Sequence, residues 1–340
     1  MQRCFKDSVS IIIPTYNRSK LLKKVLKALE NQSLEHSCFE VIVVDDGSKD
    51  DTFSMVADFE KSSSLRIRYF FQENKKQAAA RNLAIQHAVM PLLLFIGDDI
   101  VPDSDFLESH LKFHASLENP DKSCVIGYTT WPCSFRVTPF MEYIGEFGDQ
   151  FGYSLIQGNS SLPFNFYYTS NLLVPAEALK QLDYFFDEDF HVYGWEDIEF
   201  GFRLEKSGML LFYNPEAVAR HYHPVDVLSF CQRQKNVGYA STIFIKKHPE
   251  LEWLLGNRQE LLANARRYPV AFFLKFIINL MDKCYIIDKG AIINKCSIIN
   301  KYNIINRCFK LSLTHKVYRF VLDAHYARAA ISESVGKNAA

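Results

Sequence analysis

The first hundred residues alternate short apolar segments with segments of helical spacing, and this alternation restricts the fold more than any other feature. The apolar segments are 8–14, 39–44, 65–71 and 92–96. The first two are continuous and rich in β-branched residues, which is typical of strands that are buried on both faces. Helical spacing is found between them, at 18–32, 52–61 and 77–88. The alternation predicts an α/β fold with an open, mostly parallel sheet and helices on both faces.

Polar residues follow three of the four predicted strands. They are Pro14-Thr15-Tyr16-Asn17-Arg18, Asp45-Asp46-Gly47-Ser48 and Gly97-Asp98-Asp99. The carboxyl ends of parallel strands share one edge of a sheet, and ligands bind there. Adjacent carboxylates repel each other unless a cation compensates them, and Mg²⁺ or Mn²⁺ prefers such oxygen ligands. Asp-Asp-Gly-Ser is also ordinary turn chemistry, so Asp98-Asp99 is the stronger sign of a cation site.

A second acidic cluster lies at Gly194-Trp195-Glu196-Asp197-Ile198-Glu199. Apolar residues three and four apart follow it, which predicts a helix beginning here. Asp197 would lie in the first helical turn, where the helix dipole favours the ionised form that a general base requires. Taken alone, the cluster is more typical of an acidic helix cap, and Glu199 is interpreted as an ordinary helix residue.

The β signal ends near His223, and the remaining chain is helical and basic. Segments 227–247 and 250–267 have helical spacing. Residues 263–340 contain 13 Lys and Arg against 4 Asp and Glu, whereas the rest of the chain contains 26 against 35. We therefore predict a catalytic domain over 1–224 and a helical, basic region over 225–340.

The basic region has two interpretations. It could contact an anionic membrane surface peripherally, or it could be the solvated face of a helical bundle, which we favour because no single apolar stripe is evident. No nucleic-acid-binding motif is present, so a nucleic-acid partner is not expected. A six-residue repeat, with isoleucine pairs beginning at Ile286, Ile292, Ile298 and Ile304, is too short for a β-helix and is interpreted as helical.

Cysteine usage and the N-terminus bear on location. The eight cysteines include no C-x-x-C pair, which favours reduced thiols and a cytoplasmic protein. The N-terminus shows no signal-peptide pattern, and no run of about eighteen apolar residues is present. We expect a cytoplasmic protein, associated with the inner face of the membrane if the basic region binds lipid.

Five motifs in order resemble glycosyltransferase family 2, whose members have the GT-A fold. They are SVSIIIPTYNR, EVIVVDDGSKDDT, AAARNLAI, FIGDDIVP and GWEDIEFGFRL, and the resemblance covers residues 8–223. No one motif is decisive, but their order and spacing are specific. The resemblance implies an inverting, metal-dependent hexosyl- or N-acetylhexosaminyltransferase. It would move a sugar from a nucleotide-diphosphate donor, in the first instance a UDP-sugar, to a hydroxyl group on a glycan in polysaccharide biosynthesis.

The resemblance also implies roles for individual residues. The nucleotide would be bound by Pro14, Thr15, Tyr16, Arg18, Asp45, Asp46, Arg81 and Asp98. Mn²⁺ or Mg²⁺ would be held by Asp99 with His221 or His223. Asp197 would be the catalytic base with Glu196 orienting the acceptor, and Trp195 and Asn171 would shape the acceptor pocket. Gly97 stands where the family usually has a further Asp, which leaves the ribose contact without its usual residue.

These roles imply a mechanism and leave two alternatives. Asp197 would remove the proton of the acceptor hydroxyl while the metal stabilises the leaving diphosphate, and a single base opposite the leaving group implies inversion. One alternative is a sugar-nucleotide- or glycan-binding protein without turnover, which Gly97 favours. The other is a lipid-phosphate glycosyltransferase at the membrane, which the basic region favours. Asp197 argues against both.

Overall fold

The structure, a computed structural model, describes residues 8–148, 150–158, 160–255, 258–288 and 304–336. The chain divides into two compact units. Unit 1 comprises Met1–Pro132, Tyr153–His191 and Glu196–His223, and unit 2 comprises Cys133–Gly152, Val192–Trp195 and Pro224–Ala340. The last part of unit 2 begins beside the predicted boundary. Its two earlier segments were not indicated by the sequence.

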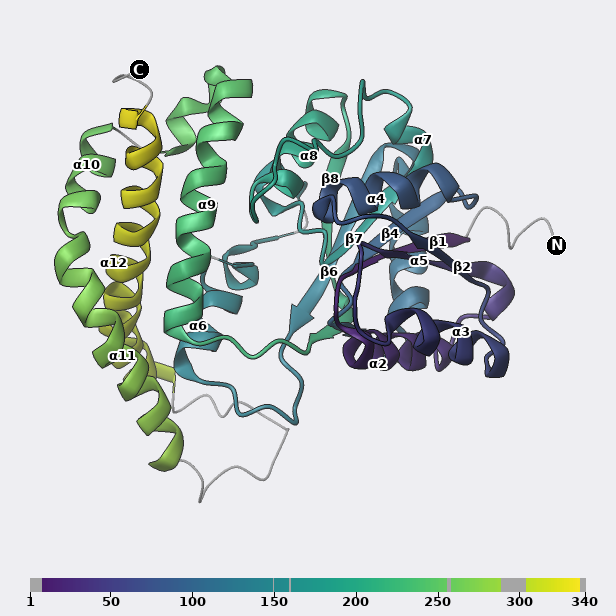
Figure 1. The fold of residues 1–340 in the computed structure, drawn as a ribbon, viewed down its shortest axis with the longest axis horizontal. Coiled ribbons are helices and arrows are strands. Elements are labelled where there is room, and N and C mark those ends of the chain that lie inside the picture. The colour runs from purple at the N-terminus through teal and green to yellow at the C-terminus, as the bar shows by residue number, and fades with distance from the viewer. Residues whose placement is uncertain (1–7, 149, 159, 256–257, 289–303, 337–340) are drawn as a thin grey trace. The chain divides into compact units, whose positions relative to one another are not determined.

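Within the described residues, unit 1 is built on a mixed eight-stranded sheet with the order β3-β2-β1-β4-β7-β6-β8-β5 (Figure 1). The strands are β1 Val9–Thr15, β2 Phe39–Asp45, β3 Ile67–Phe71, β4 Leu92–Ile96, β5 Ile100–Pro102, β6 Ser123–Thr130, β7 Asn171–Pro175 and β8 Leu210–His221. Strands β1 to β4 are parallel, as predicted. Strand β7 is antiparallel to β4 and β6, β5 is antiparallel to β8, and β6 is parallel to β8.

Helices cover both faces of this sheet, which confirms the predicted α/β architecture. They are α2 Ser19–Glu30, α3 Thr52–Ser62, α4 Lys76–His87, α5 Phe106–Ser116, α7 Ala176–Leu179 and α8 Glu196–Lys206, with short 3-10 turns at His36–Cys38, Pro120–Lys122, Tyr153–Leu155 and Phe164–Phe166. Figure 1 shows α2 and α3 on one face and α4 on the other. Ile11 and Ile13 of β1 pack in the same buried cluster as Leu26 of α2. Phe95 of β4 instead contacts Phe200 of α8. Both faces are buried, which explains the continuous apolar sequence.

Unit 2 is helical, as predicted for the C-terminal region. Its helices are α6 Pro139–Glu146, α9 Val227–Lys247, η5 Pro249–Leu255, α10 Arg258–Arg266, α11 Tyr268–Asp288 and α12 Ile304–Gly336. The single helix predicted over 250–267 is divided into η5 and α10. Helix α9 begins at a capping box of Asp226 and Ser229, and it packs closely on α12. A Cβ atom on Gly238 would lie 2.3 Å from the carbonyl oxygen of Tyr326. The six-residue repeat lies largely outside the described residues.

Helix α6 belongs to unit 2 although it precedes most of that unit in the sequence. The backbone N–H of Phe140 donates to Asp282 Oδ1 of α11 at 3.1 Å. The hydroxyl of Tyr318 of α12 donates to the same oxygen at 3.2 Å. The Phe140 ring also contacts the rings of Phe230 and Tyr318. These contacts fix residues distant in sequence in one packed layer.

The cysteines differ in part from the expectation. Cys38 is disulfide-bonded, whereas Cys124, Cys133 and Cys231 are free. The prediction of reduced thiols is therefore wrong for Cys38, because the absence of a C-x-x-C pair says nothing about cysteines that meet through the fold. In the part of the chain that the structure describes, no helix is both long and apolar enough to cross a membrane.

Candidate active site

Parallel pairing of β1 with β4 brings together the polar residues that follow these strands. Thr15 Oγ1 donates to Asp98 Oδ2 at 2.8 Å. Arg18 Nη1 lies 3.1 Å from Asp98 Oδ1 and 2.7 Å from Asp99 Oδ2. Burial and the adjacent charge of Asp99 raise the pKa of Asp98 to about 6. Four of the residues that the family resemblance assigned to the donor side, Thr15, Arg18, Asp98 and Asp99, therefore form one cluster.

Asp99 is held from a second direction by strand β8. Strand β5 pairs with β8 so that Ile100 lies opposite His221, and His221 Nε2 is 3.5 Å from Asp99 Oδ2. Burial disfavours the charge of Asp99. The hydrogen bond and charge of His221, with the charge of Arg18, nevertheless hold the pKa of Asp99 well below its usual range. Asp99 is therefore an ionised carboxylate among cations.

The two histidines lie in an aromatic stack that the sequence did not predict in full. The rings of His221 and His223 are 5.7 Å apart with an interplanar angle of 21°. The indole of Trp131 stacks on His221 at 5.3 Å and 18°. Trp131 immediately follows β6, which is parallel to β8, so only the sheet order could have indicated this contact.

The residues at this end suit a divalent cation that the donor helps to bind. An ionised carboxylate beside an imidazole is a ligand pair for Mn²⁺ or Mg²⁺. Among the described residues, no group of three or more His, Cys, Asp or Glu is placed to hold a metal ion. Asp99 and His221 would therefore hold the ion together with diphosphate oxygens of the donor. The guanidinium of Arg18 provides positive charge beside Asp99 in this structure.

Gly97 is explained by the packing around Asp99. A Cβ atom on Gly97 would lie 2.9 Å from Asp99 Oδ1 and 3.2 Å from Ile100 Cγ1. The backbone N–H of Ile100 also donates to the Gly97 carbonyl at 3.2 Å, which closes a tight turn. Glycine at this position leaves room for the Asp99 carboxylate.

Asp45 is committed to local structure at the end of β2. Its Oδ1 accepts the backbone N–H of Ser48 at 2.7 Å, and its Oδ2 accepts the hydroxyl of Tyr69 at 2.6 Å. Burial and the Asp45 partner raise the pKa of Tyr69. The Asp45 carboxylate thus fixes the Asp-Asp-Gly-Ser turn. Each of its oxygens has a second lone pair that can accept a further hydrogen bond.

Asp46 is similarly committed, to the segment before α4. Its carboxylate accepts hydrogen bonds from Gln72 Nε2 at 2.7 Å and from the backbone N–H groups of Lys75 at 2.7 Å and Lys76 at 2.9 Å. Lys76 has a φ of 72°, a left-handed conformation that is rare outside glycine. Asp46 therefore organises the turn that begins α4.

The ends of β1 and β2 are tied together, which places Tyr16 at the same edge. The backbone N–H of Asn17 donates to Ser48 Oγ at 2.8 Å, and Asn17 Oδ1 accepts the backbone N–H of Lys49 at 2.7 Å. Tyr16 is 45% exposed, and Pro14 is half-buried. An exposed ring on a fixed loop suits stacking on a nucleotide base.

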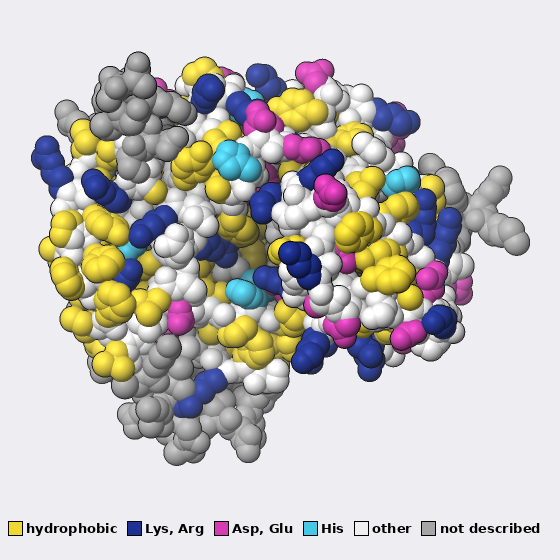
Figure 2. Space-filling view, viewed as in Figure 1, with side chains coloured by type: hydrophobic (Ala, Val, Ile, Leu, Met, Phe, Trp, Pro, Cys, Tyr) yellow, Lys and Arg dark blue, Asp and Glu magenta, His cyan; other side chains and the backbone are white. Residues whose placement is uncertain are grey.

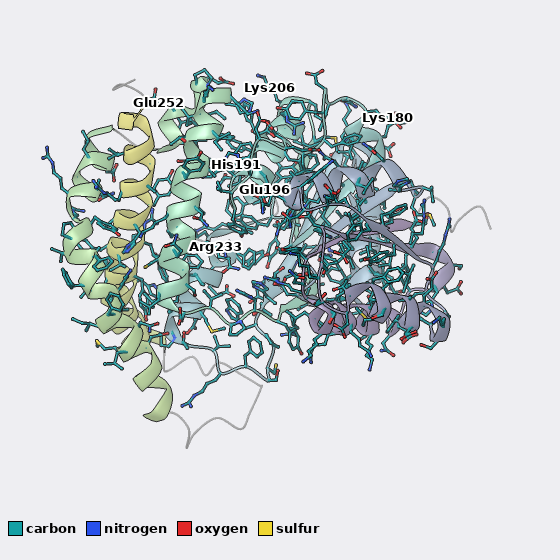
Figure 3. All side chains as sticks on the ribbon, in the orientation of Figure 1. Lys180, His191, Glu196, Lys206, Arg233 and Glu252 are labelled. Carbon is teal, nitrogen blue, oxygen red and sulfur yellow. The ribbon has the colours of Figure 1, made fainter. Side chains whose placement is uncertain are left out.

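The second acidic cluster begins α8, where Figure 3 labels Glu196. Glu196 Oε1 lies 3.4 Å from Arg81 Nη1, and both side chains are buried. Asp197 Oδ1 accepts the backbone N–H of Ile198 at 3.0 Å. Burial and the adjacent charge of Glu196 raise the pKa of Asp197 to about 7, against the opposing charge of Arg81. This carboxylate has the proton affinity of a general base near neutral pH.

Arg81 contacts the acidic pair that begins α8. Besides Glu196, its guanidinium contacts Gln77 Oε1 at 3.1 Å and the face of Phe186 at 5.1 Å. The sequence had assigned Arg81 to the nucleotide. Its contacts among the described residues are instead with the acidic pair that begins α8, because Arg81 lies on the same face of α4 as Gln77.

Two neighbours of this pair were missed by the sequence analysis. Tyr168 is buried, and burial together with the charge of Asp197 raises the pKa of its hydroxyl. Glu199 is fully buried, contacts Arg203 Nε at 2.8 Å and accepts the hydroxyl of Tyr184 at 3.0 Å. Glu199 is therefore a packed ion pair, not an ordinary surface residue of the helix. Its spacing of four from Arg203 was the available signal.

The two residues predicted for the acceptor pocket serve as packing residues. Asn171 is fully buried, with Oδ1 2.7 Å from His110 Nε2 and Nδ2 donating to the carbonyl of Ala217 at 3.0 Å. Asn171 therefore belongs to the core and not to the predicted pocket. Trp195 has a φ of 70°, and its ring lies 4.7 Å from that of Phe244 within unit 2. The Trp195 ring is therefore packed against Phe244 in this structure.

Comparison with known sequences gives a consistent result. The family model described as "Glycosyl transferase family group 2" matches residues 94–281, and "Glycosyl transferase family 2" matches residues 10–154. Validoxylamine A glucosyltransferase of Streptomyces hygroscopicus subsp. jinggangensis is 31% identical over 279 residues, which cover 74% of this chain and 64% of that relative. Chondroitin synthase of Pasteurella multocida is 29% identical over 245 residues, covering 64% of this chain and 25% of that relative. The chain thus spans less than two thirds of either relative.

Comparison with solved structures supports the fold. The mannosyltransferase PcManGT from Pyrobaculum calidifontis, in complex with GDP-Man and Mn²⁺, superposes with a TM-score of 0.60 at 17% identity, covering 96% of this chain and 86% of that chain. S. aureus TarS 1-349 in complex with UDP-GlcNAc gives a TM-score of 0.50 at 18% identity, covering 97% and 92%. At these identities the likeness concerns the fold, and it confirms the expected GT-A architecture.

Proposed function

Because the chain belongs to glycosyltransferase family 2, we propose that it transfers a sugar with inversion from a UDP-sugar to a hydroxyl group of a glycan. A nucleotide-sugar donor is supported by solved structures of similar fold, which include complexes with GDP-Man and with UDP-GlcNAc. The observation that carries the proposal is the pair Glu196 and Asp197 with Arg81 beside it. This arrangement gives one carboxylate a raised pKa while a neighbour is compensated by a cation.

Asp197 has the properties that activation of a hydroxyl group requires. An alcohol is a weak nucleophile until a base takes its proton as the new bond forms. A carboxylate with a pKa of about 7 is a stronger base than an ordinary aspartate and is still ionised in part at neutral pH. The proton moves to Asp197, the acceptor oxygen bonds to the anomeric carbon, and the nucleoside diphosphate leaves. Attack opposite the leaving group inverts the anomeric configuration.

Glu196 and Arg81 position the acceptor and set the strength of the base. Glu196 can accept hydrogen bonds from acceptor hydroxyl groups, while Arg81 compensates its charge in a buried environment. The negative charge of Glu196 raises the pKa of Asp197, and the positive charge of Arg81 limits this rise. The proposed base is therefore tuned by a residue on α4.

The donor side is proposed to hold the diphosphate with Arg18, Asp98, Asp99 and His221. The guanidinium of Arg18 has the fork geometry that binds phosphate oxygens, and a donor diphosphate would compete with the carboxylates for it. Asp99 and His221, with His223 beside them, would hold Mn²⁺ or Mg²⁺. When bound, the ion would neutralise charge on the leaving diphosphate. Thr15 fixes the Asp98 carboxylate, which approaches the ribose in this proposal.

The base of the nucleotide is proposed to lie at the edge formed by Pro14, Tyr16 and the Asp45-Asp46 turn. Tyr16 is exposed for stacking, and the two carboxylates fix the surrounding backbone. The names of the relatives support a hexose or N-acetylhexosamine as the transferred sugar and polysaccharide biosynthesis as the setting. A phosphate acceptor is less well supported, because a phosphate oxygen needs no base such as Asp197.

A donor panel tests this proposal directly. Thermal shifts of the full chain are measured with UDP-glucose, UDP-N-acetylglucosamine, UDP-galactose and GDP-mannose in the presence of Mn²⁺. We expect at least one UDP-sugar to raise the melting temperature and to release UDP when a glycan acceptor is added. A shift with GDP-mannose alone would contradict the UDP assignment. Retention of the anomeric configuration, measured by NMR of the product, would contradict the role of Asp197.

A further inference from the structure

Helix α11 exposes a continuous apolar stripe. Val270, Phe273, Ile277 and Leu280 are 62%, 69%, 56% and 64% exposed, and their spacing of three and four places them on one side of the helix. Phe276 and Met281 lie beside them and are exposed as well. A soluble helix usually presents polar residues on this side, so a stripe of this size marks an interaction surface.

The opposite side of α11 is already used within unit 2. Ala271, Ile278 and Asn279 are buried, and Asp282 accepts hydrogen bonds from Phe140 and Tyr318. The helix therefore has two apolar sides, of which the bundle covers one. The stripe remains exposed with respect to all residues that the structure describes. Figure 2 shows hydrophobic side chains with Lys and Arg among them where Figure 1 places α10 and α11.

Positive charge lies just before the stripe and beside the rings of Phe272 and Phe276. Lys275 places its Nζ 4.3 Å from the ring centroid of Phe272 and 5.0 Å from that of Phe276. Arg266 and Arg267 are exposed just before the helix. Over 263–282 the only acidic residue is Asp282, which is buried, so the exposed charges described there are all positive. Aromatic and aliphatic side chains with bordering lysine and arginine are typical of helices that lie in a membrane interface.

The sequence after α11 continues with the same chemistry. The repeat from 286 to 309 contains four isoleucine pairs, and each pair is followed two positions later by Lys or Arg. Residues 289–303 of this repeat lie outside the described residues, and the repeat is rich in apolar and basic residues. Residues 263–340 together carry 13 basic against 4 acidic residues.

We propose that the apolar stripe of α11 docks on the surface of an anionic phospholipid bilayer. The helix would lie in the plane of the interface with Phe273, Ile277 and Leu280 among the acyl chains. A second copy of the chain is less favoured as the binding partner. A two-fold contact through this stripe would bring Arg266, Arg267 and Lys275 of one copy near the same residues of the other, and these like charges repel. Anionic lipid headgroups complement the same charges. The proposal concerns unit 2 alone and goes beyond the proposed transferase reaction.

Flotation with vesicles tests the docking surface. The full chain is mixed with vesicles of phosphatidylcholine alone or of phosphatidylcholine with phosphatidylglycerol. We expect the chain to float with the anionic vesicles and at least about tenfold less with the neutral ones. The combined variant Phe273→Ser, Ile277→Ser and Leu280→Ser should lower binding by at least about tenfold. Trp253→Ser, at a residue that is 69% exposed in η5, is the matched control and should bind like the wild type.

Further readouts separate the alternatives. The melting temperature of the triple variant should equal that of the wild type, because the replaced side chains are exposed. Absence of wild-type flotation with anionic vesicles would overturn the proposal. Equal flotation of the triple variant would also overturn it, since binding would then be electrostatic only. A concentration-dependent dimer that the triple variant abolishes, without flotation, would assign the stripe to a second copy and overturn the proposal.

Discussion

Unit 1 contains two pairs of adjacent carboxylates, and their surroundings give them opposite acid–base properties. In the pair Asp98 and Asp99, burial disfavours the charge of Asp99, but the hydrogen bond with His221 and the charge of Arg18 hold its pKa well below the usual range. In the pair Glu196 and Asp197, burial and the charge of Glu196 raise the pKa of Asp197 to about 7. The same residue type is thus a permanent anion in one place and a proton acceptor in the other.

The difference follows from the placement of cations. Arg18 contacts both carboxylates of the first pair, and His221 contacts Asp99 as well. Arg81 contacts Glu196, and its positive charge only partly offsets the effect of Glu196 on the pKa of Asp197. Carboxylates compensated on several sides suit the binding of positive charge, whereas one left uncompensated suits proton transfer. In the proposed function, donor binding and base catalysis are separated in this way.

Replacing the proposed base should have the largest effect. Asp197→Asn should lower the transfer rate by about 10²–10⁴-fold, because the hydroxyl would lose its proton acceptor. The thermal shift produced by the donor should be unchanged. Near-full activity of the variant would contradict the proposed difference between the two carboxylate pairs, because Asp197 would then have no role as a base.

The same variant has a predicted effect on stability. The folded pKa of Asp197 lies above the unfolded value of about 3.9, so ionisation lowers wild-type stability as the pH rises through the interval between them. Asparagine does not ionise, so the Asp197→Asn variant should not lose stability in this way as the pH rises. Its free energy of unfolding at pH 8, measured with urea, should therefore equal or exceed that of the wild type. A clear loss of stability at pH 8 would contradict the raised pKa.

Disturbing the first pair should have the next largest effect. Asp99→Asn should lower activity by about 10²–10³-fold, because stabilisation of the leaving diphosphate would be lost. Removal of divalent ions with EDTA should abolish wild-type activity, and Mn²⁺ or Mg²⁺ should restore it. The rate is measured as UDP release across a metal titration. If EDTA leaves the wild-type activity unchanged, the proposed role of Asp99 as a metal ligand is wrong.

Removing the cation of the second pair should shift the pH dependence. In Arg81→Gln the opposing positive charge is lost, so the pKa of Asp197 should rise further and the acid limb of kcat/KM should move to higher pH. A shift of one pH unit would lower activity below the limb about tenfold. Arg81→Lys keeps the charge and should move the limb less. Equal shifts in both variants would contradict the electrostatic role of Arg81.

The third carboxylate of the cluster provides the smallest expected effect on catalysis. Glu199→Gln breaks a buried ion pair with Arg203 and should lower the free energy of unfolding by about 3 kcal/mol. Where the variant is folded, kcat/KM and its acid limb should match those of the wild type. A shift in the acid limb of the pH profile would show that Glu199 also affects the pKa of Asp197. The second cluster would then contain three coupled carboxylates instead of two.

The sequence predicted those parts of the site that depend on parallel neighbours. Buried strands alternating with helices imply parallel pairing, and parallel pairing of β1 with β4 is sufficient to bring Arg18 near Asp98 and Asp99. Helical spacing likewise predicted the start of α8 close to Glu196. Local patterns sufficed in both cases because each contact follows from a regular element and its immediate neighbour.

Contacts between elements far apart in sequence do not follow from local patterns, and only the family resemblance placed a histidine of this segment near Asp99. His221 reaches Asp99 because β5 pairs with β8, although these strands are far apart in sequence. Asn171 appeared free for a ligand, but its partners His110 and Ala217 come from α5 and β8. The apolar stripe of α11 was hidden for a related reason. A helix apolar on all sides shows its stripe only once the bundle has covered one of them.

The order of the strands also determines when the chain becomes able to bind a donor during synthesis. The strand β5, which follows Asp99, pairs with β8, and the carbonyl oxygen of Asp99 accepts the backbone N–H of Tyr222 at 2.7 Å. Strand β4 ends at Ile96 and β8 begins at Leu210, so 114 positions separate them. A nascent chain can pair β1 to β4 long before this, since domains fold as their strands emerge. The proposed cation site is completed only when β8 has been made, so we expect prematurely terminated chains to carry the nucleotide motifs without a complete donor site.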